Sequence, residues 1–483
     1  MNGRFLRSCS LLLAVAIVPA CGSSAFVPLD PLTQALLKWN TISIDASGAD
    51  HMPSGAKQQI GPCRASRSLA IVHIAMFDAA NAATSSPFQS YAGVATLPGA
   101  LPEAAVAQAA HDALVSQFSH QTATFDAALA TDLAAIPDGS AKTLGIVLGT
   151  TAAAAIVALR NPVTDGSWLA SPTVGVDYIP GGGPGEWRID PITQKEVALG
   201  GYWALVSPFT MTSASQFRAP APPALGSPQY ASAYNEVHKV GGDGITTPTI
   251  RTGDQTDIGI FWAYDGVPSL CAPPRLYNQI TTHLALQRGT TGMDLARLLA
   301  LVNTAMADAG IACWESKYFY KFWRPVAGIR EADAGTTTNP GATSPCIGDG
   351  NPATIADPTY TPLGAPASNI VAGQNFTPPF PAYPSGHAAF GGALFETLRR
   401  FYGTDTIRFT FVSDELNGVT VDGAGRVRPL RARSFESLSQ AEEENGQSRI
   451  YLGIHWAFDK TAGIAEGNRV GDWCFDHSFL PSP

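Results

Sequence analysis

The feature of this chain that best indicates its fold is the stretch PSGHAAFGGAL, residues 384–394. A short polar turn leads there into small and apolar residues, which is typical of a helix entering a core. The first N–H groups of such a helix lack partners within it and suit an oxyanion. Ser385 adds a hydroxyl, Gly386 lets a backbone amide approach a ligand closely, and His387 titrates near neutral pH. The alternative is an ordinary turn that caps a helix.

Two cations lie seven residues apart in a second helical segment, Met293 to Trp323 and its border. Seven steps of about 100° bring Lys317 and Arg324 back to within roughly 20° of one helix face. Pro325 disfavours continuation of the helix, so Arg324 is expected at a helix C-terminal end. If the pair stood alone, a solvated basic helix face would be the better explanation.

A third cluster is Ser448-Arg449 followed by His455. Six steps in one helix would rotate Arg449 and His455 about 240° apart, so the two converge only if the helix ends near Leu452-Gly453. Taken singly, His455 would be a buried or surface histidine and Arg449 half of a salt bridge. The three clusters together favour an anion site.

The rest of the chain reads as mainly α with long loops. Helix-period patterns rich in alanine cover 67–82, 103–118, 125–136 and 141–160, and a further one covers 434–450. Residues 161–250 and 331–379 are rich in Gly, Pro and polar residues and are expected to be connecting loops. No alternating strand pattern of useful length and no fixed-period repeat is present.

The first 25 residues have the layout of a secretory signal peptide, with two arginines, an apolar run over 11–18 and small residues over 20–25. Export to the periplasm or the outside of the cell is therefore expected. An alternative reading of residues 18–21 is a lipobox, which would leave Cys21 lipidated as the anchor of a lipoprotein. No later stretch is expected to span a membrane.

Net charge and cysteine content limit which other kinds of binding site the protein could contain. A formal charge of −9 excludes a basic footprint for nucleic acid, so any anion site must be local. Beyond Cys9 and Cys21 there are five cysteines, an odd number that allows one or two disulfides plus a free thiol in an oxidising compartment. None forms a CxxC pair, which weakens a zinc-site reading. These five are Cys63, Cys271, Cys313, Cys346 and Cys474.

The three clusters, in this order and spacing, resemble the three-part signature of the vanadium-dependent haloperoxidases in the vanadate-peroxidase and acid-phosphatase superfamily. Flanking segments look like fungal vanadium chloroperoxidases, and the N-terminal half is similar to bacterial members around 67–82. The loop between Pro325 and Pro384 is longer than the family's usual spacing. The flanking segments are FWAYDG at 261–266, FWRP at 322–325, PPFPAY at 378–383 and ELNGV at 415–419.

This resemblance implies a fold of two four-helix-bundle-like halves, 26–250 and 251–483, with the site in the second. It implies vanadate as cofactor, His455 as the vanadium ligand and His387 as the acid–base residue. It also implies that Asp265 pairs with Arg449, and that Trp314 and Phe380 lie on the halide side, which favours chloride. The remaining vanadate contacts would be Lys317, Arg324, Ser385, the Gly386 amide and Arg449.

The implied reaction oxidises chloride, bromide or iodide with hydrogen peroxide to a hypohalous acid equivalent, which then meets an unknown organic acceptor. One alternative is an acid phosphatase of the same superfamily that acts through a phosphohistidine at His455, because phosphate and vanadate share a tetrahedral shape. A third is an exported, non-catalytic oxyanion-binding protein. The proton-transfer residue His387 argues against that reading, since binding alone does not need one.

Overall fold

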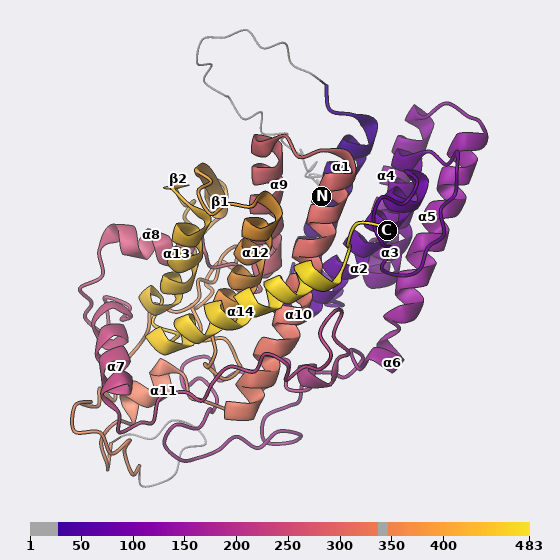
Figure 1. Ribbon diagram of the computed structural model, residues 1–483. Coiled ribbons are helices and arrows are strands. Elements are labelled where there is room, and N and C mark those ends of the chain that lie inside the picture. Colours follow the sequence, from indigo (N-terminus) through magenta and orange to yellow (C-terminus); the bar gives the residue numbers. More distant parts are fainter. Residues whose placement is uncertain (1–27, 337–345) are drawn as a thin grey trace, which may run out of the picture.

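The computed structural model describes residues 28–336 and 346–483. The predicted signal peptide, including Cys21 and Cys9, lies outside these residues. The predicted mainly α class is confirmed: long helices joined by long loops make up the fold (Figure 1). Helices of the N-terminal part are α1 Pro31–Asp50, α2 Gly61–Ala83, α3 Pro102–Gln117, α4 Thr122–Ala135, α5 Ser140–Leu159, α6 Pro162–Asp165 and α7 Pro228–Val240. Those of the C-terminal part are α8 Gly253–Phe261, α9 Pro273–Arg288, α10 Gly292–Tyr320, α11 Pro325–Arg330, α12 Gly386–Tyr402, α13 Leu438–Tyr451 and α14 Ala457–His477.

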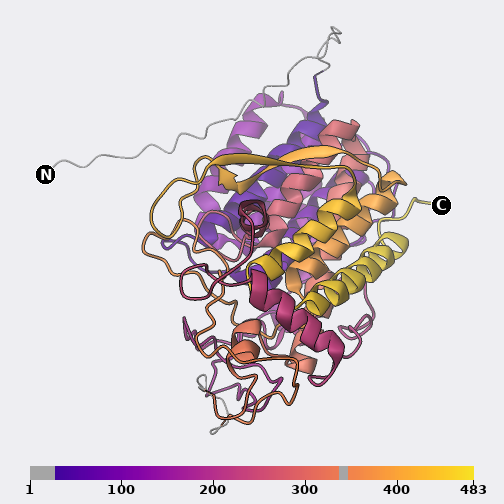
Figure 2. The ribbon, with the colours of Figure 1, turned by 90° about the vertical axis from the view of Figure 1, so that its left-hand side faces the viewer.

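Helix α10 is the central element of the molecule. It packs against α2 on one side and against α12 and α14 on the other, and the N-terminal helices α3, α4 and α5 lie beyond α2 (Figures 1 and 2). One continuous hydrophobic core joins both parts, from Phe77 of α2 through Leu299 of α10 to Phe390 of α12. The boundary proposed at residue 250 therefore separates helix groups that share a core, and it stays a prediction.

A second, smaller core is built from aromatic rings below α10. Tyr230 and Tyr234 of α7 pack there against Trp456, with ring centroids 5.4 and 6.2 Å away. This cluster fixes the chain on both sides of the candidate site, since Trp323 precedes Arg324 and Trp456 follows His455.

The structure corrects the expectation that strands are absent. β1 Phe409–Asn417 and β2 Leu430–Phe435 form an antiparallel two-stranded sheet, and the helix predicted from residue 434 begins only at Leu438. β2 is exposed at most positions, so its sequence lacks apolar alternation. Its arginines instead form ion pairs, Arg431 with Asp257 and Arg433 with Glu444.

Two further expectations differ from the structure. All five described cysteines are free and buried, so the predicted disulfides do not form among them. The segment Ser140–Asp165 and helix α10 are long and apolar enough by composition to span a membrane, which was not expected. For α10, 94% of the apolar window is buried inside the protein, as expected for a central core helix, against 33% for Ser140–Asp165.

Candidate active site

The start of α12 is shaped by tight packing against α10. Ser385 is the residue before the helix, and its backbone N–H donates to the Asp459 carbonyl at 3.0 Å. A Cβ atom at Gly386 would lie 3.0 Å from the Trp314 ring, so a larger residue there would require this ring to shift by a few tenths of an ångström. The Ser385 hydroxyl is buried and has no hydrogen-bond partner.

Lys317 lies in the last turn of α10 and is fully buried. Its ammonium donates to the carbonyls of Pro381 at 2.8 Å, Ala382 at 2.9 Å and Pro384 at 2.5 Å. Burial lowers the pKa of Lys317 to about 7. The lysine thus holds the turn that presents Ser385.

Arg324 reaches the site by a different route from the one its spacing predicted. Helix α10 ends at Tyr320 with Lys321 in the left-handed conformation, and Arg324 immediately precedes α11, so it is at the start of a helix and not at a C-terminal end. Its Nη1 lies 2.9 Å from His455 Nε2 and donates to the Ile454 carbonyl at 2.8 Å. Nη2 is buried without a partner, and burial lowers the pKa of Arg324 to about 9.

The helix before His455 ends where it must if Arg449 and His455 are to point into the same site. Helix α13 stops at Tyr451, and Gly453 adopts a positive φ of 75° that turns the chain back toward the site. The ring Nδ1 of His455 lies 2.8 Å from Asp459 Oδ2. Burial and the neighbouring Arg324 hold the pKa of His455 well below its usual value, so the ring is neutral. With Nδ1–H donating to Asp459, the lone pair of the ring lies on Nε2, where it accepts from Arg324 Nη1 at 2.9 Å.

Arg449 and Asp265 form the ion pair that the resemblance implied. Arg449 Nη2 donates to Asp265 Oδ1 at 2.7 Å, and both side chains are buried. Nε and Nη1 of Arg449 have no partner, nor has Oδ2 of Asp265. Burial raises the pKa of Asp265, and Arg449 opposes that shift.

His387 lies beside this pair on the first turn of α12. Its Nε2 is hydrogen-bonded to the Ala263 carbonyl and lies 3.9 Å from Asp265 Oδ1. Because a carbonyl only accepts, Nε2 carries the proton and Nδ1 has the lone pair. Burial and Arg449 lower the pKa of His387 well below its ordinary value.

These groups surround one cavity of about 250 Å³. Gly386, His387, Arg449, His455 and Asp265 line its polar side, whereas Lys317, Arg324 and Ser385 lie behind that surface. Trp314 and Phe380 form part of the apolar wall, with ring centroids 4.9 Å apart. All the predicted site residues therefore meet in one region.

Sequence reasoning missed two residues of this region. Asp459 orients His455, and its position four residues later on a helix start was the available signal. Lys195 lines the cavity from the loop before α7, with its ammonium 4.0 Å from the centre of the Phe376 ring. No spacing rule could find Lys195, because 70 residues or more separate it from every other group here.

The predicted site residues thus lie together between buried helices. Residues 297–480 match the family model described as the VCPO second helical-bundle domain. The vanadium chloroperoxidase of Curvularia inaequalis is 38% identical over 267 residues, a match that spans 48% of this chain and 41% of that relative. The predicted resemblance is thus confirmed for the C-terminal part of the chain.

Solved structures extend the similarity of fold to most of the chain. A bacterial vanadium-dependent iodoperoxidase superposes with a TM-score of 0.71 at 22% identity, covering 95% of this chain and 99% of its own. An apo-type bacterial vanadium-dependent chloroperoxidase gives 0.64 at 14% identity, covering 86% and 95%. The chain spans less than half the length of the curated fungal relative, but nearly all of the bacterial fold.

Proposed function

We propose that this protein is a vanadate-dependent haloperoxidase, which oxidises a halide with hydrogen peroxide to a hypohalous acid equivalent. The observation that carries the proposal is the set of buried donors left without partners beside one neutral histidine. These are Ser385 Oγ, Arg324 Nη2, and Nε and Nη1 of Arg449. Buried donors without partners are costly, so their collection around His455, at and behind the wall of one cavity, indicates an anionic ligand.

Vanadate fits this donor set. His455 Nε2 would bind vanadium, and Arg324, Arg449, Ser385 and the Gly386 amide would contact its oxygens. Forked guanidinium groups match oxyanion geometry, and their charge offsets that of a buried anion. Lys317 would add a third cation, although its hydrogens already serve three carbonyls. When bound, vanadate would supply a Lewis-acid centre that activates peroxide.

The proton-transfer role falls to His387. Its low pKa keeps it neutral at physiological pH, and its Nδ1 is the atom able to accept a proton from an incoming peroxide. The Ala263 carbonyl holds the other nitrogen and so keeps the ring in one tautomer. Asp265 holds Arg449 and limits the positive charge next to this histidine.

Chloride is the halide that we propose first. Trp314 and Phe380 provide an apolar wall next to two cations, since Arg324 lies 4.8 Å and Lys317 5.1 Å from the Phe380 ring. A halide gains from such a site because the low dielectric strengthens its attraction to the cations. Chloride comes first because Trp314 and Phe380 are the residues whose resemblance to chloroperoxidases favoured it. The similar proteins carry both chloroperoxidase and iodoperoxidase in their names, so bromide and iodide are tested beside it.

An acid phosphatase is the second candidate, favoured by one observation. The neutral His455 Nε2 lies beside Arg324 and could attack phosphorus as well as bind vanadium. If both anions use the same site, vanadate should suppress phosphate-ester hydrolysis at the same titration midpoint at which it confers peroxidase activity.

The deciding experiment is vanadate reconstitution, followed by halogenation of a dimedone-type acceptor in chloride, bromide and iodide separately. We expect vanadate-dependent turnover with at least one halide. Robust ester hydrolysis without oxidation of any of the three halides would establish the phosphatase instead. Vanadate binding without either activity would leave a non-catalytic oxyanion-binding protein.

A further inference from the structure

The segment 261–266 presents two groups to the candidate active site. Its Ala263 carbonyl accepts from Nε2 of His387, and its Asp265 carboxylate accepts from Arg449. Whatever holds this segment therefore decides where both groups point. The motif ELNGV at 415–419, which resembles a chloroperoxidase segment, has no part in the proposed reaction.

Tyr264 lies between these two groups and has a strained backbone. Its φ is 45°, in the left-handed region, and its side chain is fully buried. A bulky residue rarely adopts such a φ, and the conformation persists only where neighbouring groups hold it. Contacts from outside the segment are therefore needed to keep Tyr264 in this conformation.

Strand β1 supplies these contacts through three consecutive residues. The Ser413 hydroxyl donates to the Phe261 carbonyl at 2.6 Å. The Asp414 amide donates to the Tyr264 hydroxyl at 2.8 Å. Glu415 Oε1 accepts from the Tyr264 amide at 3.4 Å. The strand thus holds the start of the segment, and both the side chain and the backbone of Tyr264.

The Glu415 contact acts on the same peptide unit that faces His387. The unit between Ala263 and Tyr264 is trans and planar, so its carbonyl and its N–H point in opposite directions. Glu415 at the N–H end therefore fixes the direction of the carbonyl at the His387 end. A hydrogen bond at the N–H also polarises the unit, which makes its carbonyl a better acceptor.

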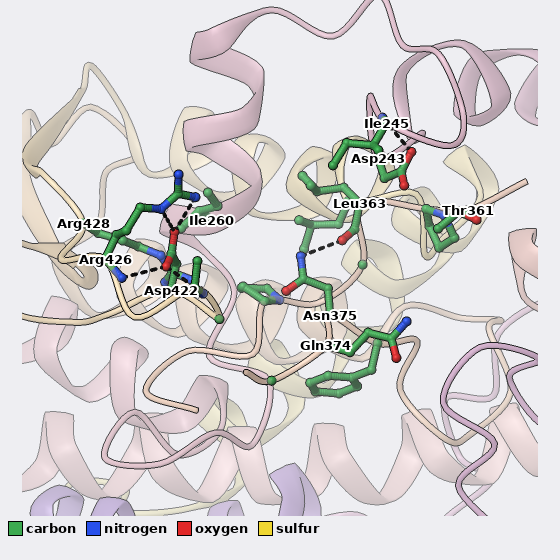
Figure 3. Close-up of a pocket in the computed structure, with 18 of the residues that line it drawn as sticks. Asp243, Ile245, Ile260, Thr361, Leu363, Gln374, Asn375, Asp422, Arg426 and Arg428 are labelled. Carbon is green, nitrogen blue, oxygen red and sulfur yellow. Dashed lines mark hydrogen bonds and ion pairs between the residues drawn. The ribbon is translucent and has the colours of Figure 1, made fainter. Parts of the chain in front are cut away.

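Two further groups hold Glu415 in place. The Ser368 hydroxyl donates to its Oε2 at 2.6 Å, and Arg428 forms an ion pair with the same oxygen. Arg428 comes from the wall of a second cavity, of about 520 Å³, which Figure 3 shows. Because both contacts use Oε2, Oε1 remains for the Tyr264 amide.

We propose that Glu415 is a positioning residue for the proton acceptor His387. By holding the Tyr264 amide, it keeps the Ala263 carbonyl on Nε2 of His387, and so keeps the lone pair of that ring on Nδ1. The inference rests on the proposed function, in which Nδ1 accepts the proton of the incoming peroxide. Ser413 supports the same segment from its other end.

The first test reads the tautomer of His387 by nitrogen-15 NMR in the vanadate-free protein, with His387→Ala to identify its signals. The unmodified protein should show a protonated Nε2 and an unprotonated Nδ1. In Glu415→Ala the peptide unit can turn, so the share of the Nδ1–H tautomer should rise several-fold. An unchanged tautomer in this variant would overturn the proposal.

The second test measures bromide oxidation at saturating vanadate. Glu415→Ala should lower kcat by about tenfold, because the proton acceptor is held in the wrong tautomer for part of the time. The KM for bromide should stay within about twofold. In the His387→Ala background, the same substitution should have no further effect on kcat, since Glu415 acts through His387. Equal losses in both backgrounds would overturn the positioning role.

Glu442→Ala is the matched control. Glu442 is also a buried glutamate paired with an arginine, Arg399, at 3.1 Å, but it makes no hydrogen bond to the segment. Its loss should lower stability and leave both the tautomer and kcat unchanged. If Glu442→Ala changed them as Glu415→Ala does, general destabilisation would explain both variants and the proposal would be wrong.

A milder variant and a separate readout keep the two proposals distinguishable. Ser413→Ala removes only one hydroxyl and should shift the tautomer and kcat in the same direction as Glu415→Ala, by a smaller amount. Absence of halide oxidation in the unmodified protein would overturn the haloperoxidase. The NMR result needs no turnover, so it would still decide whether Glu415 sets the tautomer of His387.

Discussion

Three buried arginines show how differently the two parts of this molecule use the same side chain. Arg67 of α2 has all its hydrogen-bonding nitrogens paired: it donates to Asp165 at 2.9 and 2.6 Å, to Gln117 at 3.2 Å and to the Arg160 carbonyl at 2.6 Å. Arg324 and Arg449 are equally buried but keep donors without partners. Arg67 holds structure together, whereas the free donors of Arg324 and Arg449 lie near His455, where a ligand could accept from them.

The largest expected effect is a loss of stability when the fully paired arginine, Arg67, is replaced. Arg67→Met would leave Asp165 buried without its partner and should lower the free energy of unfolding by about 3–5 kcal/mol. In the vanadate-free protein, Arg324→Met should lower the free energy of unfolding by less than about half of that amount. The reason is that it removes a cation whose donors are not all paired. Urea unfolding of the two variants measures this, and equal losses would contradict the distinction.

Two buried histidines, His455 in the site and His73 outside it, allow the same contrast to be tested by vanadate binding. His455→Ala should weaken vanadate binding by more than about 100-fold, since the proposed bond to the metal is lost. His73 is the matched control, because Leu69 and Asn40 satisfy both of its ring nitrogens at 2.7 and 2.8 Å. Folded His73→Ala should bind vanadate normally. Unchanged vanadate affinity in His455→Ala would refute the ligand assignment.

His387 should separate turnover from binding within the site. His387→Ala removes the proposed proton acceptor and should slow halide oxidation by about 100-fold, while vanadate affinity changes only a little. Steady-state rates at saturating vanadate, together with a vanadate titration, measure both quantities. A loss of affinity as large as the loss of rate would assign His387 to cofactor binding.

Asp459 should have a smaller effect, because it acts through His455. Asp459→Asn keeps the shape but weakens the orientation of the His455 ring, and should reduce vanadate affinity by about 10- to 100-fold. A shift in the pH profile of vanadate binding would accompany this loss. If affinity and profile both stayed unchanged, Asp459 would have only a structural role.

A further effect concerns proton uptake on anion binding. With a pKa of about 7, Lys317 is charged below pH 7, and above it an anion must draw a proton onto the lysine. Affinity for sulfate, whose own charge is constant here, should fall by about tenfold per pH unit between pH 7 and 9. Between pH 7 and 9 the unfolded chain keeps Lys317 protonated, whereas the folded protein loses this proton. The stability of the anion-free protein should therefore rise with pH over this range.

Calorimetric titration in vanadate-free protein measures the sulfate affinity. Lys239→Gln is the matched control, since this exposed lysine on α7 shows no comparable burial. It should retain the full pH dependence. Constant affinity from pH 7 to 9 would show that Lys317 stays protonated in the free protein.

Much of the fold could be predicted from local patterns. The alanine-rich helices, the long loops and the start of α12 at Gly386 follow from periodicity and turn chemistry, which act within a few residues. Helix α7 and the hairpin of β1 and β2 were missed. Residues of β2 are mostly exposed, and tertiary ion pairs such as Arg433 with Glu444 stabilise that strand. Helix α7 is held instead by burial of Tyr230, Tyr234 and Val237 in the aromatic core.

By itself, the sequence predicted the residues of the three clusters that the structure brings into one region, because the spacing within each cluster reflects local chain geometry. It also determined that α13 must end before Gly453 if Arg449 and His455 are to meet. Only the tertiary structure decided how Arg324 enters the site, that Asp459 orients His455, and that Lys195 and the 361–377 loop border its cavities. Such contacts join residues far apart in the chain, and they depend on how whole helices pack, which no local pattern encodes.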